Sequence, residues 1–61
     1  MKTYLVIWIY YGIDGAEEGC NRIHAKTPQA AEAEFYKYNR PFWKDEWKIG
    51  YSVEGIREVE E

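Results

Sequence analysis

The residues of this chain that could form a nucleophile–base couple of the Ser–His or Cys–His kind are few and far apart. His24, Cys20 and Ser52 are each the only residue of their type. On an extended strand Cys20 and His24 share a face but lie four residues apart, roughly 13 Å, which is too far for a Cys–His pair. Ser52 lies outside any GxSxG context. We therefore expect a protein without enzyme activity, catalytic residues or a cofactor.

Metal and phosphate sites are not indicated either. There is no CxxC motif and no cluster of Cys and His, so structural zinc is not expected. The glycines Gly12, Gly15 and Gly19 are spaced GxxGxxxG, and no Lys-Ser or Lys-Thr follows them as in a phosphate-binding loop. The acidic residues in the same stretch lack EF-hand spacing. We expect a solvated acidic segment there.

Binding chemistry is better represented, because the 61 residues include three Trp, six Tyr and two Phe. Aromatic and basic side chains alternate late in the chain, where the candidate interface residues are Arg40, Trp43, Lys44 and Trp47. This mixture suits a protein-binding hot spot or the stacking of single-stranded nucleic acid. Alternatively, the two tryptophans close the core and the lysines stay in water.

The first element that must position such residues is a strand over residues 2–11, composed almost entirely of β-branched, aromatic and leucine side chains. Alternation divides it into an aliphatic face and a mainly aromatic face. The aliphatic face consists of Leu5, Ile7 and Ile9, and the other of Tyr4, Val6, Trp8 and Tyr10. A strand that is apolar on both faces should be central and covered on both sides.

Three further elements follow. Residues 12–19 are rich in glycine and predict a turn region, and residues 20–26 predict a second strand. Thr27 and Pro28 predict the start of a helix that ends near Pro41, with Ala31, Phe35 and Tyr38 as its buried stripe. Residues 42–48 permit a helical turn or a loop, and residues 49–59 predict a third strand with a bulge or bend near Gly55.

These elements predict one domain over residues 1–61 with a two-layer α+β, ββαβ fold. We expect strand order 2-1-3, with strands 2 and 3 parallel and one helix on one face of the sheet. The helix should cover the apolar residues Leu5, Ile7, Ile9, Ile23 and Val53. The opposite face would carry the candidate interface residues Tyr4, Trp8, Tyr10, Arg22, His24 and Lys26. Alternatively, Trp43 and Trp47 fold back over that face.

The sequence therefore predicts a small non-enzymatic domain that binds a protein partner or associates as a homodimer through an aromatic sheet face or the Arg40–Lys48 segment. One alternative is a module for single-stranded nucleic acid, which the net charge of −3 disfavours. Another is a small bacterial or phage-like inhibitor or accessory protein of a mobile element. The single cysteine and the absence of any long apolar run predict a cytoplasmic protein without a membrane partner.

Overall fold

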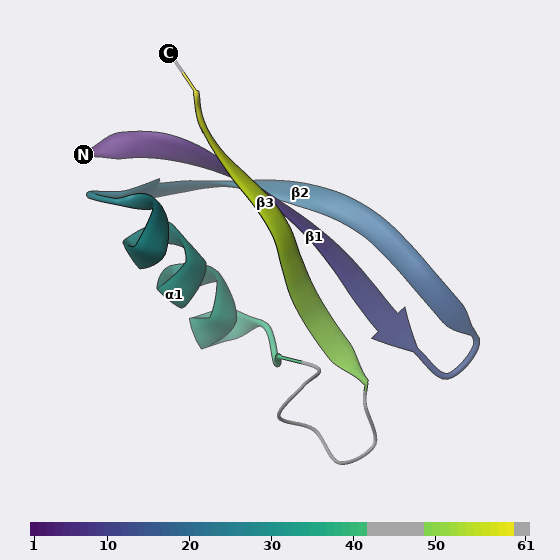
Figure 1. The fold of residues 1–61 in the computed structure, drawn as a ribbon. Helices are drawn as coiled ribbons and strands as arrows, with labels where there is room; N and C mark the ends of the chain where they lie inside the picture. Colours follow the sequence, from purple (N-terminus) through teal and green to yellow (C-terminus); the bar gives the residue numbers. More distant parts are fainter. Residues whose placement is uncertain (42–48, 60–61) are drawn as a thin grey trace.

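A computed structural model describes residues 1–41 and 49–59, which form a three-stranded sheet and one helix (Figure 1). β1 (Lys2–Gly12) and β2 (Gly15–Ala25) form a hairpin, α1 (Pro28–Tyr38) follows, and β3 (Gly50–Val59) returns to the sheet. The strand order is β2-β1-β3, so β1 is central. This confirms the predicted α+β class, the strand order and the single helix among the described residues.

Every strand pairing in the sheet is antiparallel, because β1 pairs antiparallel with β2 on one side and with β3 on the other. The sequence analysis described strands 2 and 3 as parallel, and this is corrected here: the named strands form no parallel pair. β2 and β3 do not pair with each other, because β1 lies between them. Hydrogen bonding between the named strands is therefore antiparallel throughout.

The hairpin is longer and its turn tighter than predicted. Gly12 pairs with Gly15, which leaves only Ile13 and Asp14 as the loop. Gly15 has a φ of 136°, a conformation that a residue with a Cβ atom rarely adopts and that glycine allows. Residues 15–19, predicted as part of a turn region, thus belong to β2. Both strands of the hairpin have 11 residues.

The helix begins where the sequence predicts. Thr27 is the N-cap, and its hydroxyl accepts a 3.0 Å hydrogen bond from the backbone N–H of Ala30. Ala31 and Phe35 are buried as predicted, but Tyr38 is 75% exposed and does not continue the stripe. Tyr36 takes its place against the sheet. The helix ends at its C-cap Asn39, whose side-chain amide donates to the Phe35 carbonyl at 2.9 Å.

The third strand contains the predicted irregularity. Ile7 lies opposite Gly55 and Trp8 lies opposite Val53, which leaves Glu54 as the additional residue of a bulge. The bulge keeps apolar side chains of β3 on one side of the sheet, where Tyr51, Val53 and Ile56 all pack against the core. The bulge that was predicted at Gly55 is therefore one residue earlier, at Glu54.

The helix packs on the face of β1 opposite to the one predicted, which is the main correction. Tyr4 and Val6 are buried with Ala31 and Phe35, and Trp8 packs against them. The cause is the hairpin register, which places Tyr4 opposite Ile23, a half-buried residue that packs against the core. The even-numbered residues of β1 therefore face α1, and Leu5, Ile7 and Ile9 lie on the other side of the sheet.

Candidate protein-interaction face

The side of the sheet under α1 is held by a cluster of aromatic rings, and we call this side the covered face. Phe35 of the helix stacks on Trp8 of β1, with ring centroids 6.3 Å apart. Tyr51 of β3 meets both rings edge-on, at 5.2 Å from Trp8 and 5.7 Å from Phe35. The ring centroid of Tyr10 lies 4.9 Å from that of Tyr51, and Tyr10 extends the cluster toward the hairpin tip. Large rings let one short helix bury much apolar surface.

The indole of Trp8 is held in position by β2. A Cβ atom built on Gly19 would lie only 2.3 Å from Cζ2 of Trp8, so the indole occupies space that any other residue would fill. The indole Nε1 donates a 3.2 Å hydrogen bond to Oδ1 of Asn21. Gly19, which the sequence suggested only as part of a turn, is thus a packing residue of the covered face.

The edge of β3 is tied to the helix by Tyr36. Its hydroxyl oxygen accepts a 2.7 Å hydrogen bond from the backbone N–H of Val53. Burial raises the pKa of Tyr36, this hydrogen bond lowers it, and the carboxylates of Glu32 and Glu54 raise it, with a net increase above the usual 10.0. The phenol therefore stays protonated in the folded protein across the neutral range.

On the opposite side of the sheet, which we call the open face, the aliphatic residues of β1 lie in three cross-strand rows, between the row of Thr3 and the row of Tyr11. The strand registers place one residue of each strand in every row. The first row is Arg22, Leu5 and Arg57; the second is Cys20, Ile7 and Gly55; the third is Glu18, Ile9 and Ser52. The aliphatic residues of β1 in these rows are half-buried between their neighbours. Among residues 1–41 and 49–59, no helix or further strand packs on these aliphatic side chains.

The two ends of the open face differ in charge. Arg22 and Arg57 flank Leu5 at one end, and both are exposed. At the other end Glu18 flanks Ile9, and Ser52 donates a 2.8 Å hydrogen bond to the carboxylate of the bulge residue Glu54. The open face is thus an aliphatic centre line with a basic end and an acidic end.

His24 and Cys20 also lie on the open face but do not form a reactive pair. His24 Nδ1 is 3.0 Å from the hydroxyl of Thr3, its partner across the hairpin. Cys20 is an exposed free thiol opposite Ile7. Because the row that contains Arg22 lies between them, this part of the site offers no Cys–His couple.

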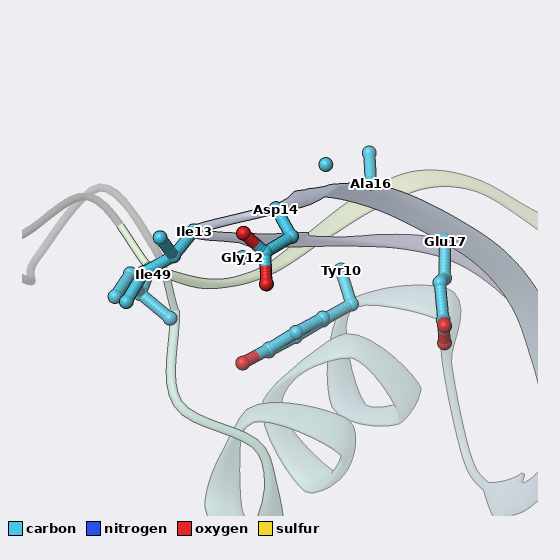
Figure 2. Close-up of a pocket in the computed structure, with 8 residues that line it drawn as sticks. Tyr10, Gly12, Ile13, Asp14, Ala16, Glu17 and Ile49 are labelled. Carbon is cyan, nitrogen blue, oxygen red and sulfur yellow. The ribbon is translucent and has the colours of Figure 1, made fainter.

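A second surface feature is a hollow of about 450 Å³ near the hairpin tip (Figure 2). Figure 2 shows the Tyr10 ring crossing it, with the carboxylate of Asp14 at the tip and Glu17 further along the hairpin. Ile13, which also lines it, is 86% exposed. Among the described residues that line it, the polar side chains are one phenol and two carboxylates, which define no particular chemistry.

The structure divides the predicted interface residues between two faces. Tyr4, Trp8 and Tyr10 belong to the covered face, so they cannot form the predicted exposed aromatic patch. Arg22 and His24 are on the sheet side predicted to be open, together with the aliphatic residues that the sequence assigned to the helix.

The remaining predicted interface residues are at or beyond the ends of elements. Lys26 is exposed just after β2, and the carbonyl of Arg40 accepts a 2.8 Å hydrogen bond from the N–H of Tyr51. Trp43, Lys44 and Trp47 lie outside the described residues. The sequence analysis left out Glu18 and Arg57 and assigned Leu5, Ile7 and Ile9 to the helix side. The hairpin register was the signal that could have placed Glu18.

Within residues 1–41 and 49–59, no three His, Cys, Asp or Glu side chains converge as metal ligands would. Among the same residues, no helix is both long and apolar enough to cross a bilayer. No family model matches the chain, and no curated protein or solved structure is significantly similar to it. The two faces of the sheet are therefore the main indication of function.

Proposed function

We propose that this chain is a small, non-enzymatic protein-binding domain whose interaction surface is the open face of the sheet. The observation that supports the proposal is the line of Leu5, Ile7 and Ile9 on the sheet side away from α1. Isolated apolar side chains on a surface are ordinary, but several that adjoin one another along a central strand are typical of an interface. Flanking charges would supply the polar rim that such interfaces have.

The size of the domain supports the same proposal. Among the described residues the buried apolar side chains are only Tyr4, Val6, Ala25, Ala31 and Phe35. The protein exposes 4707 Å², compared with roughly 4,200 Å² expected for a compact chain of this mass. A partner on the open face would bury apolar surface that one helix cannot reach. The proposal places the protein in the cytoplasm, where Cys20 would stay a thiol.

A photo-crosslinking amino acid at Ile9 tests this proposal, with one at Ala33 as the matched control. Ile9 lies on the open face, and Ala33 is an exposed position of α1. In cells that express the full chain, we expect irradiation to join the Ile9 variant covalently to a protein, either another copy or a different chain. The Ala33 variant should give no such adduct. Equal yields from the two positions, or none from Ile9, would contradict the proposal.

A further inference from the structure

We propose that the occupant of the open face is a second copy of this chain, related by a twofold axis that runs across the strands at Ile7. This inference rests on the proposed function and names its partner. Along β1, the rows of Leu5, Ile7 and Ile9 are basic, neutral and acidic in that order. With this order, the basic end of one copy can face the acidic end of a second copy across a twofold axis.

A face-to-face pair of sheets can have its twofold axis across the strands or along them. An axis across the strands keeps β2 over β2 of the other copy and reverses the order of the rows. Arg22 then lies over Glu18 of the second copy, and Arg57 lies near Ser52 and Glu54. Leu5 lies over Ile9, and Ile7 meets its own equivalent. Every charged end therefore meets its opposite.

The other axis, along the strands, keeps the order of the rows and exchanges β2 with β3. Arg22 would then lie over Arg57 of the second copy, and Glu18 would lie near Glu54. Like charges facing each other across an interface oppose association. The charges on the open face thus select the axis that runs across the strands.

The area of the open face is sufficient for a weak dimer. Three strands at about 4.8 Å spacing and residues 3–11 at about 3.3 Å rise give a plane of roughly 14 by 26 Å. Two such planes with their side-chain relief bury on the order of 1,000 Å², near the lower limit for specific interfaces. We therefore expect a dissociation constant on the order of micromolar.

Cys20 gives this arrangement a direct reporter. It lies in the central row, so the proposed axis places it over Cys20 of the second copy. Packed sheets are about 10 Å apart, which is too far for a disulfide. A bis-maleimide with a spacer of that length should join the two thiols. The alternative axis places Cys20 over Gly55 and moves the thiols apart.

The experiment measures molar mass by sedimentation equilibrium over roughly a hundredfold range of concentration, together with the yield of Cys20 cross-links at each concentration. We expect a reversible monomer–dimer equilibrium that weakens as salt screens the four charge pairs. Arg22→Glu should weaken the dimer at least about tenfold, because it places a carboxylate over Glu18 of the second copy. Adding Glu18→Arg in the same chain should restore dimerisation and cross-linking.

Three results would overturn the inference. One is a monomer throughout the concentration range; if the Ile9 photo-crosslinker still joins another protein in cells, the proposed function stands and only self-association fails. Another is a dimer that Arg22→Glu strengthens, which would indicate the alternative axis. The third is a dimer that Ile7→Lys leaves intact while circular dichroism shows the native fold, which would place the interface elsewhere.

Discussion

The two faces of this sheet share one central strand but use it differently. The covered face presents Tyr4, Val6, Trp8 and Tyr10 to a short helix, and aromatic rings from three elements contact one another there. The open face presents the smaller aliphatic side chains of the same strand, between two arginines at one end and acidic groups at the other. The larger rings reach the helix and hold the fold, and we propose that the flatter face binds a partner.

The difference also reflects the length of the helix. An 11-residue helix is about 16 Å long, whereas the molecule extends 36 Å along its longest axis. Figure 1 shows α1 beside one end of the sheet and the hairpin tip well beyond it. One helix can stabilise only part of one face, so large side chains on that face carry most of the packing.

Phe35→Ala should have the largest effect on the covered face. The ring is 1% exposed and contacts Trp8, Tyr36 and Tyr51. Its loss should cost about 3–5 kcal/mol, compared with a total free energy of unfolding of roughly 3–9 kcal/mol for a chain of this length. A urea titration followed by far-ultraviolet circular dichroism should find this variant largely unfolded. A loss under about 1 kcal/mol would mean that the aromatic cluster does not hold the fold.

Two glycine-to-alanine substitutions compare how tightly the two faces are packed, because each adds one methyl group to one face. Gly19→Ala places a Cβ atom 2.3 Å from the Trp8 indole, so the indole must shift and strain its hydrogen bond to Asn21; we expect a loss of about 1–3 kcal/mol. Gly55→Ala is the control, because its Cβ atom meets nothing closer than Ile7 Cδ1 at 3.9 Å. That variant should stay within about 0.5 kcal/mol of the parent in the same titration. Equal losses in the free energy of unfolding for the two variants would mean that the covered face is not more tightly packed than the open face.

Tyr36→Phe should have a smaller effect, about 1 kcal/mol, because it removes the acceptor of the Val53 N–H at the edge of β3. The raised pKa of Tyr36 contributes stability that is present below pH 10 and is lost as pH rises through the pKa of the folded state. Tyr36→Phe should therefore flatten the alkaline decline in the free energy of unfolding. Tyr38→Phe is the control for the loss of stability, because Tyr38 is largely exposed; this variant should stay within about 0.5 kcal/mol of the parent.

Much of the fold was predictable because its signals are local. Thr27 and Pro28 start the helix through capping and ring geometry, and the apolar run of β1 requires a central position. The choice of face was not local. It depends on the Gly12–Gly15 pairing, which sets Tyr4 opposite Ile23, and a turn counted as eight residues instead of two conceals that register.

The side of the sheet that carries the aromatic candidate residues was mispredicted for the same reason. Aromatic residues are typical of binding surfaces, so Trp8 and Tyr10 suggested an interface, while their packing partners Phe35 and Tyr51 are far away in the sequence. Gly19 could have indicated the covered face, since a glycine inside a strand marks a close approach. The basic and acidic rows require the registers of both strand pairs, which only the fold supplies.

The most direct test of the account compares two neighbouring residues of β1 that point to opposite faces. Val6→Asp and Ile7→Asp introduce the same carboxylate, and urea unfolding is measured at a protein concentration low enough to keep the parent monomeric. We expect Val6→Asp to be unfolded, because Val6 is fully buried and an unpaired charge there costs several kcal/mol. Ile7→Asp should remain folded with a loss below about 1.5 kcal/mol. If Ile7→Asp unfolds the chain as Val6→Asp does, Ile7 belongs to the core and the open face is not an interaction surface.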